Sequence, residues 1–263
     1  MQNADKPLLG KRIMVTRAAG DNDSFCNLLK EKGAHPIEFP TIAFEEIKTQ
    51  NSIQILESIQ DYSYLIFTSR NGVKYFFKRF LDLYTKEKVQ HLKIICIGSE
   101  TERYLNTFGI EARFVPEDYR GEGLVTYFDK EGNLKDKKIL IPRAQEAREL
   151  LEKTLDRRGA LVTILPLYRA TKPSNGKELQ KVLLENHLDV ITFASSKTCT
   201  NFFEMLGEEV RIYLNGVCFG VIGPITQKTL EKYGYKKVII PQKYTMSSLV
   251  EAMCDYYNQE GKL

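Results

Sequence analysis

The stretches IFTSRNGVKYFF (66–77) and ITFASSKTCTNFF (191–203) decide the fold of this chain of 263 residues. Each begins with a short apolar run typical of a buried strand, passes through a Ser that can cap a helix, and continues into an amphipathic segment. Phe67 and Ser69 in the first stretch match Phe193 and Ser195 in the second, 126 residues further on. The same strand-to-helix turn therefore occurs twice, which indicates an internal duplication.

The repetition extends over most of the chain. At the offset of 126, the further matches are Arg17 with Arg143, Gly33 with Gly159, and Pro40 with Pro166. At an offset of 125, the matches are Gly98 with Gly223, Thr101 with Thr226, Gly109 with Gly234, Pro116 with Pro241, and Leu124 with Leu249. One short gap explains the change of offset. The period is too long for a solenoid, so the pattern predicts a duplicated domain.

Each copy alternates short apolar strands with helices. The first copy offers strands at 12–17, 64–68, 94–98 and 111–116, and helices at 24–33, 69–83, 99–109 and about 124–128. The second copy offers strands at 138–143, 189–195, 218–223 and 236–241, and helices at 149–159, 224–234 and 247–257. This alternation predicts an α/β fold with two doubly wound parallel-sheet domains.

Several residues mark the expected helix ends. We expect Asp21, Asp23 and Ser99 to act as N-terminal caps. Gly33 and Gly109 suit the left-handed position that ends a helix. By contrast, segments 35–47 and 161–171 are long extended runs interrupted by Pro, and we expect them to be connectors between domains.

The composition narrows the class of protein. A formal charge of +4, with 43% hydrophobic and 27% charged residues, is typical of a globular chain, and no Lys/Arg block predicts a nucleic-acid site. No apolar run approaches the roughly 18 residues that span a membrane, and the N-terminus lacks a signal-peptide core, so we expect a cytoplasmic protein. The five cysteines form no CxxC pair, and Cys96 and Cys218 fall within strand patterns as core residues.

The strand ends carry the candidate binding residues. In parallel sheets, ligands bind beyond the carboxyl ends of the strands, where unpaired N–H groups of helix N-termini favour anions. The candidates are Thr16, Arg17, Thr68, Ser69, Gly98, Ser99 and Thr101 in one copy, and Pro142, Arg143, Ala194, Ser195, Ser196, Gly223 and Thr226 in the other. The hydroxyls have a simpler reading as helix caps. The matched Arg17 and Arg143 favour contacts to carboxylate or phosphate, against a reading as solvated side chains.

The sequence lacks the motifs that mark nucleotide-binding, serine-nucleophile and metal sites. The chain has no GxGxxG after a strand, no GxxxxGK[ST] and no GxSxG. His35, His91 and His187 are isolated, and no Cys/His/carboxylate cluster has the spacing of a metal site. An enzyme built on this sequence is expected to work without cofactor, metal or covalent nucleophile, through positioning and electrostatics.

An ordered set of motifs resembles the uroporphyrinogen-III synthase family. The motifs are VTR (15–17), IFTSRNGV (66–73), IGSET (97–101), IPR (141–143), LPLYRAT (165–171), TFASS (192–196), IGPITQKTL (222–230) and PQKYTMSSLVEAM (241–253). The resemblance covers nearly the whole chain, although no single motif is specific. It implies a monomer of two α/β domains joined by a two-stranded connector, with one domain formed by 1–38 plus 170–263 and the other by 39–169. The repeat alone suggests a tandem split near residue 131, and the sequence does not choose between the two.

The resemblance also implies a reaction. The substrate is a linear tetrapyrrole with eight carboxylates, hydroxymethylbilane, handed over from hydroxymethylbilane synthase. It closes to uroporphyrinogen III in haem biosynthesis, with loss of water and inversion of ring D, through an azafulvene cation and a spiro-pyrrolenine. The resemblance places Tyr168 in the connector, facing the cleft between the domains, where it could protonate the leaving hydroxyl; alternatively, Tyr168 is a packing residue.

Two other functions use the same strand ends. One is a non-catalytic, two-lobed binding or sensor protein that closes on an acidic small molecule. The other is a dinucleotide-dependent enzyme with a degenerate phosphate loop. Neither the preferred function nor the sensor requires nucleic acid, a membrane or a cofactor.

Overall fold

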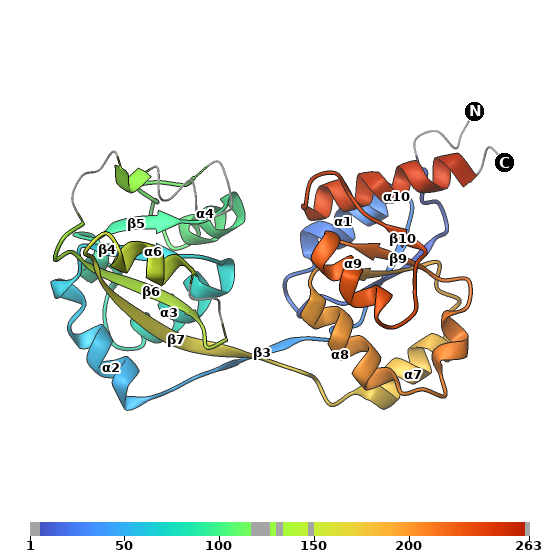
Figure 1. The fold of residues 1–263 in the computed structure, drawn as a ribbon, viewed down its shortest axis with the longest axis horizontal. Helices are drawn as coiled ribbons and strands as arrows, with labels where there is room; N and C mark the ends of the chain where they lie inside the picture. The colour runs from blue at the N-terminus through green and yellow to red at the C-terminus, as the bar shows by residue number, and fades with distance from the viewer. Residues whose placement is uncertain (1–5, 117–126, 130–133, 147–149, 261–263) are drawn as a thin grey trace. The chain divides into compact units, whose positions relative to one another are not determined.

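Short strands followed by helices recur throughout the computed structural model, which describes residues 6–116, 127–129, 134–146 and 150–260. Its contacts divide the chain into two compact units (Figure 1). Unit 1 consists of Met1–Ala43 and Thr171–Leu263, and unit 2 consists of Phe44–Ala170. Unit 1 is therefore built from both ends of the chain, and unit 2 is a continuous insertion.

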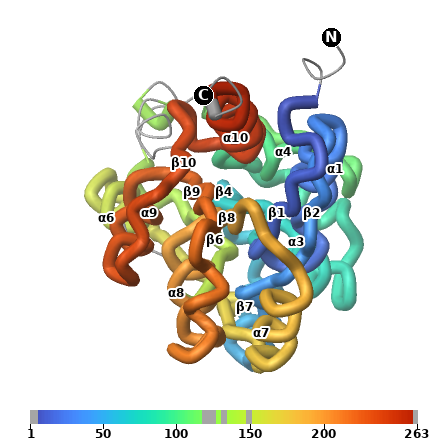
Figure 2. The backbone as a smooth tube through the Cα atoms, turned by 90° about the vertical axis from the view of Figure 1, so that its right-hand side faces the viewer, coloured from blue at the N-terminus to red at the C-terminus, as the bar shows by residue number. Residues whose placement is uncertain are grey.

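Unit 1 contains a five-stranded sheet in the order β10-β9-β8-β1-β2. Its strands are β1 (Arg12–Val15), β2 (His35–Glu38), β8 (Val190–Phe193), β9 (Cys218–Val221) and β10 (Val238–Ile239). All neighbouring strands run parallel, and Ile13 of β1 lies opposite Val190 of β8. Figure 2 shows β1 and β2 beside β8 and β9, although about 150 residues of chain separate the two pairs.

Helices cover both faces of this sheet. On one face, Met14 and Phe193 pack with α7 (Gly176–Glu185), α8 (Ser196–Leu206) and α9 (Pro224–Glu231). On the other face, Ile13 and Val15 pack with α1 (Asp23–Glu31) and α10 (Met246–Glu260). Because consecutive strand residues point to opposite faces, strands apolar throughout serve two cores, as the sequence pattern predicts. The short η3 (Arg211–Leu214) adds Leu214 to the first core.

Unit 2 contains a second five-stranded sheet, in the order β3-β7-β6-β4-β5. Its strands are β3 (Ala43–Glu46), β4 (Tyr64–Phe67), β5 (Lys93–Cys96), β6 (Lys138–Ala144) and β7 (Leu161–Thr171). The pairs β7·β6, β6·β4 and β4·β5 are parallel. The edge strand β3 runs antiparallel to β7, because Thr171 bonds Ala43, Arg169 bonds Glu45, and Ile47 bonds Leu167.

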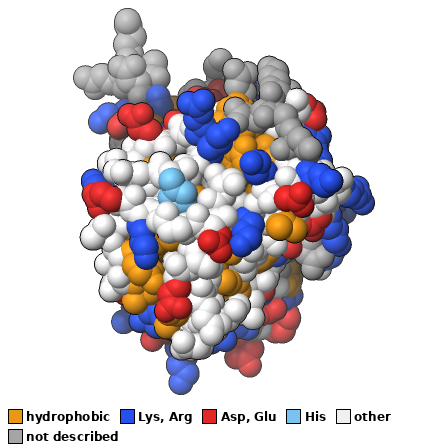
Figure 3. Space-filling model, turned by 90° about the vertical axis from the view of Figure 1, so that its left-hand side faces the viewer, with side chains coloured by type: hydrophobic (Ala, Val, Ile, Leu, Met, Phe, Trp, Pro, Cys, Tyr) orange, Lys and Arg blue, Asp and Glu red, His pale blue; other side chains and the backbone are white. Residues whose placement is uncertain are grey.

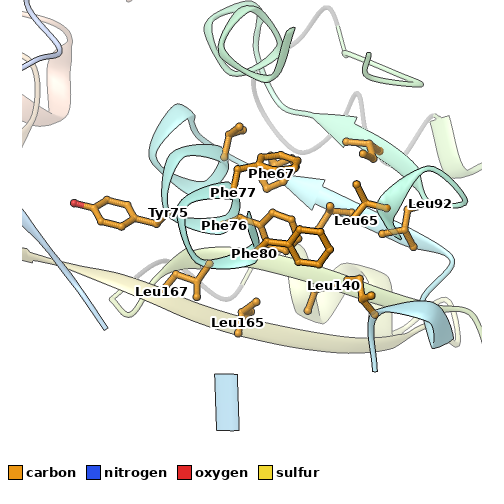
Figure 4. Close-up of a cluster of buried hydrophobic side chains, with 14 of the residues drawn as sticks. Leu65, Phe67, Tyr75, Phe76, Phe77, Phe80, Leu92, Leu140, Leu165 and Leu167 are labelled. Atoms are coloured by element: carbon orange, nitrogen blue, oxygen red, sulfur yellow. The ribbon is translucent and has the colours of Figure 1, made fainter. Parts of the chain in front are cut away.

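The larger core of unit 2 is rich in aromatic side chains (Figure 4). Helix α3 (Arg70–Leu81) places Phe76 and Phe80 against the sheet, with their rings stacked 5.2 Å apart. The elements that complete this side are α2 (Gln50–Glu57), η1 (Ile59–Asp61), η2 (Lys86–Val89) and α4 (Ser99–Asn106). Leu155 of α6 (Leu150–Asp156) packs on the opposite face. The predicted doubly wound α/β fold is thus confirmed in both units.

Each of the two sheets contains strands from both copies of the duplicated sequence. Strand β1 of the first copy pairs with β8 of the second, whereas β6 of the second copy pairs with β4 of the first. Segment 35–47 contributes β2 to one sheet and β3 to the other. Each sheet therefore combines the beginning of one copy with the middle of the other.

The structure corrects some local predictions. Residues 111–116 form only an isolated bridge, between Phe114 and Ile95, instead of a strand. The N-cap of α1 is Asn22, not Asp21 or Asp23, and its side chain makes no capping bond. The N-cap of α4 is Gly98, so Ser99 is the first helical residue.

The glycine helix ends are confirmed. Gly33 and Gly109 follow α1 and α4 with positive φ angles of 91° and 69°. Leu124, with most of the helix predicted around it, lies outside the described residues; positions 127–129 are helical.

Charged side chains of both signs lie on the surface, and the cysteines lie in the interior. On the face drawn in Figure 3, Lys and Arg side chains are interspersed with Asp and Glu. Among the residues with described positions, no helix could cross a membrane, and no group of three or more His, Cys, Asp or Glu could hold a metal ion. All five cysteines are free and buried. Cys96 and Cys218 lie in β5 and β9, as predicted.

Candidate functional site

The turn from β4 into α3 connects Ser69 with Tyr168. Ser69 is the N-cap of α3, and its Oγ accepts a hydrogen bond of 3.1 Å from the backbone N–H of Gly72. The same Oγ lies 3.0 Å from the hydroxyl oxygen of Tyr168 on β7. A Cβ at Gly72 would lie 2.9 Å from the carbonyl oxygen of Pro142, so Gly lets β6 approach the helix closely. Ser69 is therefore both a cap and a hydrogen-bond partner for the connector residue.

Tyr168 is a buried side chain, with 4% of its surface exposed. Its ring stacks on Tyr75 at 4.8 Å between centroids and meets the edge of Phe44 at 5.6 Å. The packing alternative for this residue is thus correct for the ring. The hydroxyl, held beside Ser69, is the part that could act chemically.

Arg143, at the end of β6, forms an ion pair with Glu152 of α6. Only 8% of Arg143 is exposed. The register of β6 and β7 shifts after Arg143, so that Ala144 lies opposite Tyr168. Because β6 and β7 run parallel, Arg143 and Tyr168 lie toward the same end of the sheet. The alternative reading of Arg143 as a solvated side chain is wrong, because its guanidinium already has a carboxylate partner.

The turn from β5 into α4 offers mainly backbone groups. Gly98 has φ of 95°, a conformation that other residues rarely adopt. Thr101 is buried and donates its hydroxyl hydrogen to the carbonyl of Ile97. Ser99 is exposed, and Thr68 at the end of β4 is half-buried. Ser99 is therefore the most exposed hydroxyl of this pair of turns, and Thr68 and Ser69 are both half-buried.

Unit 1 builds a matching turn from β8 into α8. The Ser195 Oγ accepts a hydrogen bond of 3.2 Å from the N–H of Thr198, and the Thr198 hydroxyl accepts one from the N–H of Ser195. This reciprocal capping box fixes the helix start. Ser196 donates its hydroxyl hydrogen to the carbonyl of Ile225 in α9, at 3.2 Å. The hydrogen bond from Ser196 joins two neighbouring helix starts.

At the start of α9, an exposed aromatic ring rests on Gly223. A Cβ at Gly223 would lie 3.3 Å from the ring of Tyr244, which is 55% exposed. Thr226, in the first turn of this helix, is buried. Since the φ of 178° is open to any residue, a side chain at position 223 would be limited only by the ring of Tyr244, which is exposed and can move.

Thr16 and Arg17, predicted together at the end of β1, differ in environment. Thr16 is fully buried and donates its hydroxyl hydrogen to the carbonyl of Thr192 at 2.6 Å. That bond ties β1 to β8, and the hydroxyl is not available to a ligand in this conformation. Arg17 is half-buried, with no hydrogen bond or ion pair to another residue that the structure describes. Arg17 is thus the more exposed of the two matched arginines.

Comparison with known proteins identifies the family. A family model described as "Uroporphyrinogen-III synthase HemD" matches residues 23–251. The chain belongs to the uroporphyrinogen-III synthase family. A uroporphyrinogen-III synthase of Synechococcus elongatus is 29% identical over 263 residues, covering 97% of this chain and 99% of the relative.

Solved structures of uroporphyrinogen-III synthases share the fold. The Helicobacter pylori protein superposes with a TM-score of 0.66 at 16% identity, covering 94% of this chain and all of that one. A mutant from Thermus thermophilus superposes with a TM-score of 0.58 at 20% identity, covering 95% of this chain and all of that one. At these identities, the structural likeness establishes the fold only.

In this member of the uroporphyrinogen-III synthase family, the sequence did not predict three residues that contact the candidate site residues: Tyr75, Glu152 and Tyr244. Tyr75 and Glu152 lie within helical patterns, where they read as packing and surface residues. Their relevance depends on contacts with Tyr168 and Arg143 that sequence spacing does not reveal. Tyr244 had a usable signal, because it lies two residues before the start of the last helix, at Met246.

The buried thiols of this family member are poor nucleophiles. Burial raises the pKa of Cys96 and of Cys199 to about 12. Both thiols therefore stay protonated near neutral pH and behave as apolar core groups.

Proposed function

We propose that this protein is a uroporphyrinogen-III synthase, a hydro-lyase that closes linear hydroxymethylbilane to uroporphyrinogen III with loss of water and inversion of ring D. The observation that carries the proposal is the family match over residues 23–251. The capped turns at Ser69 and Ser195 support it, because they provide similar strand ends in both units. Family members are enzymes of haem biosynthesis, and we assign the protein to the same pathway.

The substrate is a polyanion, and the strand ends suit it. Its eight carboxylates can accept hydrogen bonds from backbone N–H groups at the helix starts and from the two arginines. Arg17 is half-buried, whereas Arg143 is buried, and a substrate carboxylate reaching Arg143 competes with Glu152. The proposed substrate-binding residues are Thr16, Arg17, Thr68, Ser69, Gly98, Ser99, Thr101, Arg143, Ser195, Ser196, Gly223 and Thr226. For Thr16 and Thr101, which are buried and donate their hydroxyl hydrogens to backbone carbonyls, we propose the role of fixing the turns that carry the other residues.

Ring closure begins with loss of the hydroxyl from the terminal hydroxymethyl group. The C–O bond breaks, the oxygen takes a proton and leaves as water, and the electron pair of the adjacent pyrrole stabilises the remaining carbon as an azafulvene cation. We assign Tyr168 as the group that helps the proton reach this oxygen, since its hydroxyl is fixed beside Ser69. Attack by the substituted carbon of ring D then gives the spiro intermediate from which the inverted ring forms.

The task of the protein is to choose between two ring closures. The bilane closes unaided to the uninverted isomer, so the enzyme must favour attack at the substituted carbon. A tenfold preference requires about 1.4 kcal/mol of difference between the two transition states. Holding the ends of the substrate by several carboxylates can supply more than this amount. We further propose that the protein acts as a cytoplasmic monomer, without a cofactor, and receives its substrate from hydroxymethylbilane synthase.

The test is the isomer composition of the product. The purified protein is supplied with hydroxymethylbilane made in place by its synthase, and the oxidised products are separated as uroporphyrins I and III. Isomer III in excess over the protein concentration supports catalysis. Isomer I alone, with saturable binding of the bilane, would establish the non-catalytic binding protein instead.

A further inference from the structure

The face of Tyr168 is covered by one other tyrosine, Tyr75, on helix α3. We propose that Tyr75 is a positioning residue that holds the Tyr168 hydroxyl against Ser69 for the ring-closure reaction. The inference rests on the proposed function, because it gives Tyr75 its role through the group assigned there to proton transfer.

Contacts with Tyr168 and with Phe44 fix Tyr75 itself. Its ring lies 4.8 Å from that of Tyr168, with 17° between the planes. Its hydroxyl donates a hydrogen bond of 3.0 Å to the carbonyl oxygen of Phe44 in β3. With 7% of its surface exposed, Tyr75 has little freedom to leave this position. The hydrogen bond anchors one end of the side chain and the helix anchors the other.

Tyr168 is thereby held from three directions. Tyr75 covers the face of its ring, Phe44 meets it edge-on at 85°, and Ser69 contacts its hydroxyl. The Ser69 Oγ is in turn held by the Gly72 N–H, at the start of the helix that carries Tyr75. One helix therefore determines both the plane of the phenol and the partner of its hydroxyl.

Packing in the apolar core does not by itself explain why residue 75 carries a hydroxyl group. Its neighbours in the helix, Phe76, Phe77 and Phe80, fill the core with apolar rings, whereas the Tyr75 oxygen points away from them (Figure 4). A hydroxyl on a packing residue is useful here because β3 presents the carbonyl of Phe44. Lys78, one helical turn later, binds the carboxylate of Glu46 at 2.9 Å and thus reinforces the attachment of β3 to α3.

The first test measures turnover. Tyr75→Leu removes the stacked ring and the hydroxyl, and we expect kcat to fall about tenfold with KM nearly unchanged, since small misplacements of a reacting group are costly. Tyr75→Phe keeps the stack and is expected to retain a third to a half of kcat. The control is Tyr84→Leu: Tyr84 packs on Phe80 at 5.3 Å, and among the described residues no ring contact or hydrogen bond joins it to Tyr168 or Phe44. We expect that change to lower stability and leave kcat unaltered.

A double-mutant cycle separates positioning from general destabilisation. If Tyr75 acts through the Tyr168 hydroxyl, Tyr75→Leu changes kcat less than twofold in a Tyr168→Phe background. Independent, multiplying losses would overturn the inference. An unchanged kcat in Tyr168→Phe would overturn it as well.

A spectroscopic measurement makes the inference independent of activity. With tyrosine labelled at ¹³Cζ, the Tyr168 resonance is the one that disappears in Tyr168→Phe. We expect it to shift in Tyr75→Leu and to stay in place in Tyr84→Leu. A resonance unmoved by Tyr75→Leu would contradict the inference even in an enzyme that makes isomer III. Production of isomer I alone would refute the proposed function, and with it the catalytic purpose of the arrangement.

Discussion

Residues of the same type at equivalent strand ends have different roles, and this limits what sequence can predict. Thr16 and Ser69 both follow an apolar strand. The Thr16 hydroxyl donates to the backbone carbonyl of Thr192 beside the neighbouring strand, whereas the Ser69 hydroxyl forms a hydrogen bond with that of Tyr168. The sequence pattern predicted that polar groups would lie there. Which of them remain accessible depends on partners more than 90 residues away in the chain, so local pattern could not decide it.

The Tyr168 hydroxyl can be removed with little disturbance to the core. We expect Tyr168→Phe to keep the ring packing against Tyr75 and Phe44 and to slow turnover several-fold to tens-fold. Circular dichroism and a urea titration check folding, and the bilane assay checks turnover. Unchanged kinetics in the folded variant would remove Tyr168 from the mechanism.

The two matched arginines should differ in their effect on stability. We expect Arg17→Ala and Arg143→Ala each to raise KM about tenfold by removing a carboxylate anchor. Arg143→Ala also leaves Glu152 without its partner and should cost about 1–3 kcal/mol of unfolding free energy, whereas Arg17→Ala should cost little. Urea unfolding and steady-state kinetics measure the two effects. A collapse of kcat at constant KM would contradict the anchor assignment.

The buried thiols predict loss of stability in alkali. The pKa of Cys96 and of Cys199 is raised from 9.0 to about 12 in the folded protein. Above pH 9 the unfolded chain loses these protons while the folded chain keeps them. Unfolding free energy should therefore fall by up to about 1.4 kcal/mol per pH unit for each thiol. Urea midpoints between pH 8 and 10.5 should decline less steeply in a Cys96→Ala/Cys199→Ala double variant than in wild type; parallel declines would refute the assignment.

At the scale of elements, the repeated turns were predictable and the irregular segments were not. The apolar strand, the Ser cap and the amphipathic helix are encoded locally, so β4–α3 and β8–α8 follow from their residues. Residues 111–116 look similar, with Ala112, Phe114 and Val115 as apolar residues, yet only Phe114 forms a bridge, with Ile95. Strand pairing depends on the neighbouring strand, and a short apolar segment does not by itself supply that information.

The two serine caps allow an internal comparison. Ser195→Ala removes a helix cap, and we expect it to lower unfolding free energy by about 1 kcal/mol with modest change in kcat. Ser69→Ala removes a cap and also the partner of Tyr168, so we expect a similar loss of stability with a clear fall in kcat. Chemical denaturation and the bilane assay on both variants provide the comparison. Equal effects on kcat would show that the contact between Ser69 and Tyr168 is irrelevant to turnover.

At the scale of the whole molecule, the exchange between copies explains why the repeat alone was ambiguous. Matched residues report common ancestry, but they say nothing about which strands pair. Strands β1 and β4 belong to one copy and lie in different sheets. The motifs that indicated the family implied the crossed arrangement, and the contacts divide the chain at Ala43/Phe44 and Ala170/Thr171. We propose that these two units are the functional domains.

We expect unit 2, residues 44–170, and the remainder of the chain to fold independently of each other. The Thr171 hydroxyl lies 3.4 Å from the carbonyl oxygen of Ala43, so a turn of about two residues can join these positions after removal of 44–170. We expect both the joined unit 1 and the isolated unit 2 to unfold cooperatively in urea and to give dispersed amide spectra. Neither piece should form isomer III alone. An unfolded 44–170 fragment would show that unit 2 depends on the rest of the chain.

The pairing of β1 with β8 has a consequence during synthesis. Strand β1 leaves the ribosome early, but Val190, which lies opposite Ile13, is made 177 residues later. At ordinary elongation rates this delay is roughly 10–35 s. The inserted unit can fold in that interval, while Ile13, Met14 and Val15 lack one of their two neighbours. Nascent chains stalled between residues 170 and 190 should therefore present these apolar strands to chaperones.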